Sequence, residues 1–226
     1  MNYGFEDKLP LNLTSDQDKS NRLQIQLYEH VINGIDLNEK SLLEVGSGRG
    51  GGLDYLCRYK RLNALTGIDL SHKAIKQCKS AFACDKLQFI QGSSDNLPVA
   101  NKSQDIVLNV ESSHCYPDMN AFVKEAHRVL KPDGDFLLCD LRNKSGEQAI
   151  EKTFKECGFK IIKKNVITKN VLDALDIMSN DRRTIADDVP VILRKAFIDF
   201  AGVNSSTAYD LLKDNKLIYV SYQLKK

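Results

Sequence analysis

The sequence predicts an α/β fold in which a doubly wound, seven-stranded sheet carries helices on both faces. Two observations lead to this class. Short apolar runs alternate with amphipathic helical patterns along the chain, as in parallel βαβ units. A glycine-rich loop follows the first apolar run, at the junction of a strand and a helix. With 226 residues, 42% of them hydrophobic, the chain is expected to form one domain spanning 1–226.

The predicted elements follow one another in a simple order. Residues 1–40 are expected to form an arm and a first helix, with apolar residues at helical spacing over 21–35. A core spans 41–166, with strands at 41–45, 64–69, 87–91, 105–109, 136–140 and 160–167, and helices at 53–59, 71–82, 119–130 and 146–157. A helical cap insertion is predicted over 168–216, before a last strand over 217–224.

The charge balance and the cysteine pattern exclude several classes of function. The chain has 32 basic and 30 acidic residues, so we expect no nucleic-acid partner and a small-molecule substrate. Six cysteines form no C-x-x-C pair and no Cys/His cluster, which predicts reduced thiols and no metal site. The N-terminus lacks a signal-peptide pattern, and no run of about 18 apolar residues occurs, which predicts a cytoplasmic protein without a membrane span. The oligomeric state stays open.

The loop from Glu44 to Gly52 reads E-V-G-S-G-R-G-G-G. Glycines at such a loop let the backbone approach a ligand that any Cβ atom would repel. Asp69 ends the second strand, where a carboxylate can accept hydrogen bonds from ribose hydroxyls. Gly46, Gly48 and Gly51 also match the G-x-G-x-x-G spacing of NAD-binding proteins. The glycines alone therefore do not exclude a dehydrogenase.

Glu44 favours a different cofactor. It lies near the end of the first strand, directly before Val45 and the glycine loop. A carboxylate in that position would repel a pyrophosphate, but it suits the cationic methionine end of S-adenosylmethionine, directly or through a positioned network. The sequence therefore favours a methyltransferase over a dehydrogenase.

Four ordered segments resemble the motifs of the class I S-adenosylmethionine-dependent methyltransferases, a Rossmann-like family. These segments are residues 44–50, 65–71, 92–98 and 129–134. Two positions depart from the family pattern. Ser93 stands where an aspartate usually contacts the adenine amino group, and Asp133 replaces a glycine. At the level of the fold, the resemblance covers about residues 21–166.

The resemblance implies that the chain binds S-adenosyl-L-methionine and releases S-adenosyl-L-homocysteine. It also implies that Asp69 holds the ribose and that the stretch beginning at Gly92 holds the adenine. Tyr28 is expected either to contact the carboxylate of the cofactor or to pack in the core. The candidate cofactor-binding residues are Tyr28, Glu44, Gly46, Ser47, Gly48, Gly50, Asp69, Leu70, Ser93, Ser94 and Asn109.

The loop after the fourth strand carries a candidate base. His114 lies in N-V-E-S-S-H-C-Y-P-D, and an imidazole is a competent base for a hydroxyl proton near neutral pH. Asp140 ends the adjacent strand, where a carboxylate can orient the ring and stabilise its cation. Methyl transfer is a direct displacement at sulfonium, so the base only prepares the nucleophile. Structural roles stay open for both, His114 as a hydrogen-bonding loop residue and Asp140 as a cap of the following turn.

This loop, the segment F-A-G-V at 200–203 and the segment N-Y-G-F at 2–5 resemble natural-product O-methyltransferases that act on sugars, polyketides and phthiotriol-type lipids. In sugar O-methyltransferases of that group the matching histidine and aspartate form the catalytic pair, which implies this role for His114 and Asp140. The resemblance implies transfer to a hydroxyl oxygen of a small, largely apolar molecule enclosed by the arm and the cap. Two alternatives are N-methylation of a small amine and a catalytically silent, cofactor-binding partner subunit.

Overall fold

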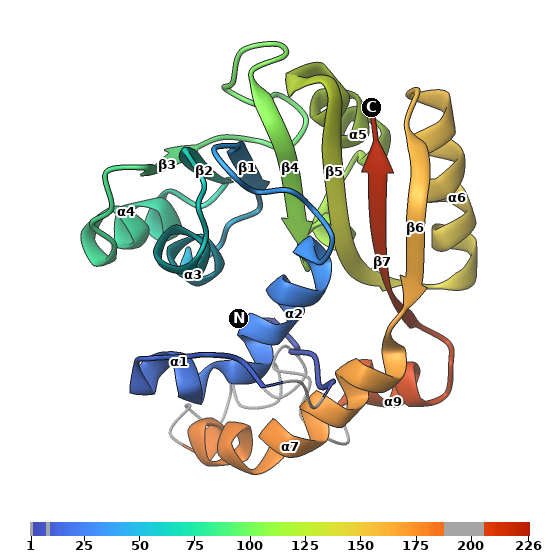
Figure 1. Ribbon diagram of the computed structural model, residues 1–226. Coiled ribbons are helices and arrows are strands. Elements are labelled where there is room, and N and C mark those ends of the chain that lie inside the picture. Colours follow the sequence, from blue (N-terminus) through green and yellow to red (C-terminus); the bar gives the residue numbers. More distant parts are fainter. Residues whose placement is uncertain (1, 8–9, 188–205) are drawn as a thin grey trace.

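The structure is a computed structural model and describes residues 2–7, 10–187 and 206–226 (Figure 1). Within these residues, seven strands form one sheet in the order β3-β2-β1-β4-β5-β7-β6. The strands are β1 (Ser41–Val45), β2 (Ala64–Asp69), β3 (Leu87–Gln91), β4 (Gln104–Val110), β5 (Leu130–Arg142), β6 (Lys160–Val166) and β7 (Ile218–Lys225). The helices are α1 (Asp16–Ser20), α2 (Arg22–Ile32), α3 (Gly51–Tyr59), α4 (His72–Ala81), η1 (Ser113–Cys115, a 3-10 helix), α5 (Met119–Val129), α6 (Lys144–Glu156), α7 (Thr168–Asp187) and α9 (Thr207–Lys213).

The sheet is parallel except where the last strand enters it. β1, β2, β3, β4 and β5 pair in parallel, and β7 lies antiparallel between β5 and β6. The predicted seven-stranded α/β sheet is therefore confirmed. Because the parallel strands share one direction, their carboxyl ends meet at one edge, the edge from which ligands are bound in open sheets of this kind. That edge faces α1, α2 and α7 (Figure 1).

The two large hydrophobic clusters of the described residues lie on opposite faces of the sheet, and a small third one joins Leu23 to α7. Leu42 of β1 packs in a cluster with residues of α2, α3 and α4, such as Leu27 and Leu53. The next residue, Leu43, packs in a second cluster with residues of α5 and α6, such as Phe122. Adjacent strand residues point to opposite faces, so an uninterrupted apolar run such as Leu42-Leu43 is what a sheet covered on both sides requires.

Two elements differ from the predicted ones. The sequence K-P-D-G predicts a turn before the fifth strand, but β5 is continuous from Leu130 to Arg142. Gln104 pairs with Leu130 and Ile106 pairs with Asp135, so the intervening residues form an irregularity within a strand pair. The short helix α1 lies in the predicted arm, where its polar sequence gives no apolar periodicity.

The N-terminal arm is tied to both α2 and α7. The backbone nitrogen of Phe5 donates to the carbonyl of Leu23 over 3.0 Å, and that of Glu6 donates to the carbonyl of Asn170 over 3.1 Å. Helices α7 and α9 fall within the predicted cap, and residues 188–205 of that cap lie outside the described part of the chain. Among the described residues, no helix is both long and apolar enough to cross a membrane.

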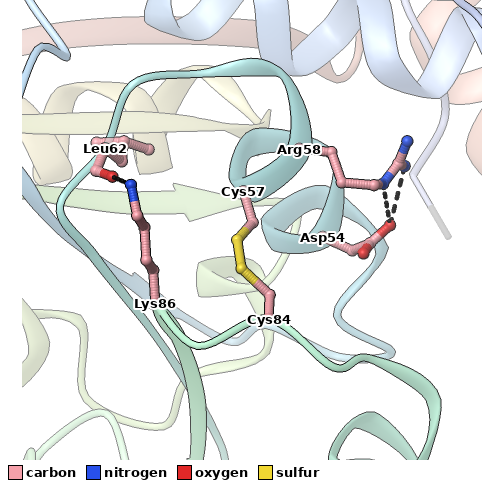
Figure 2. Close-up of a disulfide and its surroundings, with 6 residues drawn as sticks. All are labelled: Asp54, Cys57, Arg58, Leu62, Cys84 and Lys86. Atoms are coloured by element: carbon pink, nitrogen blue, oxygen red, sulfur yellow. Dashed lines mark hydrogen bonds and ion pairs between the residues drawn. A yellow bond between two sulfur atoms is a disulfide. The ribbon is translucent and has the colours of Figure 1, made fainter.

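The prediction that all six cysteines are free thiols is wrong for two of them. Cys57 of α3 and Cys84, in the segment between α4 and β3, form a disulfide (Figure 2). The remaining cysteines are free: Cys78, Cys115, Cys139 and Cys157. The two bonded residues are 27 positions apart, and the crossover through β2 and α4 brings them together, so their spacing gave no signal in the sequence.

Candidate active site

A cavity of about 1040 Å³ lies at the carboxyl edge of the parallel strands. Its wall combines the glycine loop after β1, the segments after β2, β3 and β4, and residues of the N-terminal arm, α1 and α2. Cavities of this size at strand ends are typical small-molecule sites. His114 lines it. Of the predicted cofactor-binding residues, those on the wall are Tyr28, Gly46, Ser47, Gly48, Gly50, Asp69, Leu70, Ser93 and Ser94.

The glycine loop lies close against the ends of β1 and β2. Gly46, Gly48 and Gly50 have φ angles of +78°, +52° and +75°, in the left-handed region that favours glycine. The backbone nitrogen of Gly46 donates to the carbonyl of Ile68 over 2.7 Å. A Cβ atom on Gly46 would lie 2.2 Å from Oγ of Ser112. A side chain at this position would therefore force the loop away from the strand ends.

Asp69 ends β2 and connects the loop to the cavity. Its carboxylate accepts a hydrogen bond from the backbone nitrogen of Gly48 and another from that of Ser71, each over 2.8 Å. These bonds fix the carboxylate at the wall, where its remaining lone pairs can accept further donors such as ribose hydroxyls. Leu70 follows it on the cavity wall, and 71% of its surface is exposed.

Glu44 is buried behind the glycine loop and is covered by Tyr28. The Tyr28 hydroxyl, from α2, donates a hydrogen bond of 2.6 Å to Oε1 of Glu44. Burial raises the pKa of Glu44 to about 8, although the bond from Tyr28 acts in the opposite direction. The Tyr28 ring lies directly over Gly52, where a Cβ atom would be 2.0 Å from the ring. The first long helix thus places a tyrosine between the cavity and the buried carboxylate.

Buried polar atoms without a hydrogen-bond partner in the described part of the chain gather around this cavity. They are Oε1 of Gln24, Oε2 of Glu44, Oγ of Ser47 and Oδ1 of Asn109. Native structures leave few such atoms unsatisfied, and a group with several hydrogen-bond donors bound in the cavity would satisfy them. An ammonium and two ribose hydroxyls are donors of that kind, and the residues present therefore fit S-adenosylmethionine.

Asn109 and Glu44 lie behind the cavity wall rather than on it. The Asn109 amide nitrogen donates to the carbonyl of Val45 over 2.9 Å, to Oγ of Ser112 over 2.8 Å and to the hydroxyl of Tyr116 over 3.0 Å. The residue therefore ties the end of β4 to the end of β1, and its direct contact with a cofactor stays a prediction.

The structure brings together His114, at the end of the cavity beside the segment after β4, and Asp140, which is buried behind it. Nδ1 of His114 lies 2.7 Å from Oδ1 of Asp140. The imidazole is 35% exposed, whereas the carboxylate is completely buried. The hydrogen bond to Asp140 raises the pKa of His114, against the opposing effect of burial. With Nδ1 engaged by the carboxylate, Nε2 is the ring nitrogen left for a molecule in the cavity.

Ser113 and Arg142 hold the carboxylate of Asp140 in place, and neither residue was predicted from the sequence. The Ser113 hydroxyl donates to Oδ2 of Asp140 over 2.7 Å, and the backbone nitrogen of His114 donates to the same atom over 2.9 Å. Nη1 of Arg142 lies 3.1 Å from that oxygen. A signal for Arg142 was present, because residues i and i+2 of one strand lie on the same face.

Glu111 is a second acidic group on the cavity wall that the sequence analysis did not select. Its Oε1 accepts a 2.6 Å hydrogen bond from the backbone nitrogen of Tyr3 and another from the hydroxyl of Tyr219. Its φ angle is +48°, in a region that non-glycine residues adopt with strain. Burial raises the pKa of Glu111 to about 7. The arm and the last strand therefore meet at the reacting end through one carboxylate.

Cys115 follows His114 at the cavity but is not arranged as a nucleophile. Burial and the charge of Asp140 raise the pKa of its thiol, which disfavours the reactive thiolate. The imidazole of His114 is hydrogen-bonded to Asp140 and is therefore not directed at the thiol of Cys115.

Comparisons with known proteins show the family to which the chain is similar. A family model described as a methyltransferase domain matches residues 43–138. The chain is 35% identical to a phthiotriol/phenolphthiotriol dimycocerosates methyltransferase of Mycobacterium tuberculosis, over 100% of this chain and 84% of that protein. It is 34% identical to a fatty-acid O-methyltransferase of Mycolicibacterium smegmatis, over 98% of this chain and 81% of that protein.

The fold has solved counterparts. A geranyl diphosphate C-methyltransferase from Streptomyces coelicolor A3(2), solved with S-adenosyl-L-homocysteine, superimposes with a TM-score of 0.72. The two sequences are 17% identical, and the match covers 100% of this chain and 92% of that one. At this identity the likeness concerns the fold.

Proposed function

The chain belongs to the S-adenosylmethionine-dependent methyltransferases, and from this premise we propose that it methylates a hydroxyl oxygen of a small, largely apolar molecule of natural-product or lipid type. The observation that carries the proposal is the His114–Asp140 pair at the cavity wall, with Nδ1 and Oδ1 2.7 Å apart. A hydroxyl is a poor nucleophile until it loses its proton, and an oriented imidazole is the group that removes it near neutral pH.

The cofactor would be held by residues at the cavity wall and by Glu44, which lies directly behind it. The glycine loop from Gly46 to Gly50 offers backbone close to the ligand, Asp69 offers acceptors for the ribose, and Glu44 with Tyr28 offers acceptors and a hydroxyl for the amino-acid end. When bound, S-adenosylmethionine supplies an electrophilic methyl group on a sulfonium.

The described residues act on the acceptor in three ways. Asp140 fixes the ring of His114 so that Nε2 is available to the acceptor hydroxyl. Nε2 takes the hydroxyl proton as the oxygen becomes a nucleophile, and the buried charge of Asp140 stabilises the imidazolium that results. The N-terminal arm, which is hydrogen-bonded to Glu111 through the backbone of Tyr3, covers part of the cavity and limits the entry of water beside His114.

The charges at the reacting end favour a hydroxyl over a carboxyl acceptor. One relative is named for fatty-acid O-methylation, and a fatty acid arrives as a carboxylate that needs no base. Here the buried carboxylate of Asp140 lies beside His114 and would repel such an anion. A neutral alcohol or phenol meets no such repulsion and requires the base that is present.

The test is an acceptor panel with radiolabelled S-adenosylmethionine and the full chain. We expect methyl transfer to long-chain alcohols or phenols above that to 1-aminooctadecane and stearic acid, and loss of alcohol methylation by about 10²–10⁴-fold in His114→Ala. Cys115→Ala, a change at the next residue of the same wall, is the matched control and should keep the wild-type rate. Preferred transfer to the amine with full activity in His114→Ala would replace the proposal by N-methylation.

The alternative that the chain is a catalytically silent subunit is tested by combining the acceptor panel with a binding measurement. Calorimetry with S-adenosyl-L-homocysteine reports whether the cofactor site is intact independently of any acceptor. Saturable binding together with transfer to none of the acceptors would contradict the proposed activity toward this class of molecule.

A further inference from the structure

Three ionisable side chains surround His114, two of them acidic and one basic. Asp140 contacts its Nδ1, Glu111 at the end of β4 adds a second negative charge, and Arg142 on β5 supplies the positive one. Tyr219, from β7, approaches Glu111 as a neutral hydrogen-bond donor. The protonation state of the imidazole is therefore set by a balance between carboxylates on two strands and one guanidinium.

Arg142 makes its contacts on the side of Asp140 away from the imidazole. Nη1 lies 3.1 Å from Oδ2 of Asp140, and Nη2 donates to Oγ of Ser113 over 2.5 Å. Nη1 also donates to the carbonyl of Leu141 over 2.7 Å. The side chain is 9% exposed, so solvent screens its charge weakly. Arg142 thus contacts both the carboxylate and the hydroxyl that hold the ring of His114, without lining the cavity itself.

We propose that Arg142 is a positioning residue for methyl transfer, whose guanidinium holds Asp140 and Ser113 in place beside His114 and offsets part of the negative charge that faces the imidazole. This inference rests on the proposed role of His114 as the base. It concerns a residue that touches neither the cofactor nor the acceptor and acts through the carboxylate.

The sign of the effect follows from elementary electrostatics. The carboxylates of Asp140 and Glu111 stabilise the imidazolium form of His114, and the charge of Arg142 destabilises it. If the guanidinium is removed, the two carboxylates act unopposed and the ring holds its proton to higher pH. If the carboxylate of Glu111 is removed instead, the ring loses its proton at lower pH. A general loss of structure would not move these two variants in opposite directions.

The experiment is an NMR pH titration of the histidine side chains in the full chain, with saturating S-adenosyl-L-homocysteine to support the fold. The chain has four histidines, and His114→Gln identifies the signal of interest. We compare wild type with Arg142→Gln, Glu111→Gln and Arg142→Lys, which keeps the charge. Lys131→Gln is the matched control, because it removes a cation paired with Asp105 at the opposite end of the same strand.

The titration midpoint of His114 is expected to move upward in Arg142→Gln, downward in Glu111→Gln, and to stay near the wild-type value in Arg142→Lys and Lys131→Gln. Arg142→Met takes the place of the glutamine variant if that variant does not fold. An unchanged or lowered midpoint in the folded Arg142 variant overturns the proposal. So does an equal upward shift in Arg142→Lys, because charge would then not be the cause.

Turnover of Arg142→Gln supplies a second readout. We expect the rate at pH 6.5 to fall about tenfold, because each pH unit of displacement changes the unprotonated fraction about tenfold below the midpoint, and to recover by pH 9. A loss that is equal at both pH values would indicate a merely structural role and contradict the proposal.

The titration separates this inference from the proposed function. Should the midpoint move as expected while His114→Gln keeps its turnover, His114 is not the base and the proposed function and the positioning role both fall. Should His114→Gln be inactive while the midpoint is unmoved in Arg142→Gln, the base stands and the inference about Arg142 alone is wrong.

Discussion

The hydroxyl of Tyr28 lies 2.6 Å from Oε1 of Glu44, so a side chain from the first long helix covers a carboxylate buried at the end of β1. The tyrosine ring is in turn placed by the glycine loop. This relationship makes the loop and the helix preceding the sheet parts of one cofactor site, although 16 residues of sequence separate the two side chains.

Of the two adjacent glycines at the start of α3, only Gly52 should be sensitive to replacement by alanine. A Cβ atom on Gly52 would lie 2.0 Å from the Tyr28 ring, whereas one on Gly51 would meet no atom within 4 Å. Overpacking typically costs about 1–3 kcal/mol. We expect Gly52→Ala to weaken binding of S-adenosyl-L-homocysteine by about fivefold or more in calorimetry, as Tyr28 is displaced from Glu44. Gly51→Ala should bind like wild type, and equal losses in both variants would contradict this account.

Asp140→Asn should reduce turnover without affecting cofactor binding. An amide at this position cannot stabilise the imidazolium of His114 and favours the wrong ring tautomer, so kcat is expected to fall about 10²–10⁴-fold. Because Asp140 lies behind the cavity wall, the Kd for S-adenosyl-L-homocysteine should change less than about twofold. A kcat within twofold of wild type would remove the pair from the mechanism.

Glu44 should make the cofactor-free protein less stable as pH rises. Burial raises the pKa of Glu44 to about 8, so the folded state binds a proton that the unfolded chain has already released above about pH 4.5. The free energy of unfolding therefore falls with pH in this window, by at most about 1.4 kcal/mol per unit from this group. Denaturant unfolding of wild type and Glu44→Gln from pH 5.5 to 8 measures the difference.

The matched control for that series is Glu125→Gln. The hydrogen bond from Arg128 lowers the pKa of Glu125, so the stability that this carboxylate contributes is complete above pH 5.5 and is lost only as pH falls further. Its difference from wild type should be flat between pH 5.5 and 8. A flat difference for Glu44→Gln as well would show that its carboxylate is ionised throughout.

The disulfide between Cys57 and Cys84 should be detectable and stabilising. Alkylation of the denatured, unreduced protein should modify four of the six cysteines, since four are free. A cross-link closing a loop of this length contributes about 3–4 kcal/mol by restricting the unfolded chain, so Cys57→Ser with Cys84→Ser should lower Tm markedly. Cys157→Ser is the control at a free cysteine. Modification of all six cysteines would contradict the bond.

Much of the fold could be predicted because its signals are local. β1, β2 and β3 have the predicted bounds, since each is a short apolar run that ends at a turn. The start of β5 at Leu130 was not predicted, because Leu130 pairs with Gln104 while the following K-P-D-G residues, 131–134, pair with no residue of β4. Helix α1 was missed for a related reason: the Ser15 cap and the ion pair from Asp18 to Arg58 hold a short polar helix that periodicity cannot detect.

The residues of the candidate site also fall into those that the sequence predicts and those that it does not. Glu44, Asp69 and His114 could be selected because motif position and side-chain chemistry coincide in the sequence. The contacts of Glu111 could not be selected, because Tyr3 and Tyr219 reach it from opposite ends of the chain. Such contacts depend on which distant segments meet in the folded protein, and this cannot be predicted from a single sequence.

The insertion of β7 between β5 and β6 also constrains how the protein can be made. β6 pairs with β7 alone within the described sheet, so a nascent chain that has emerged only as far as β6 has no neighbour for that strand. The edge of β5 that β7 later covers stays open for the same interval. Unpaired edges of this kind attract chaperones and other chains. The sheet is therefore complete only after residues 218–225 have left the ribosome, and until then one edge of β5 and one edge of β6 stay unpaired.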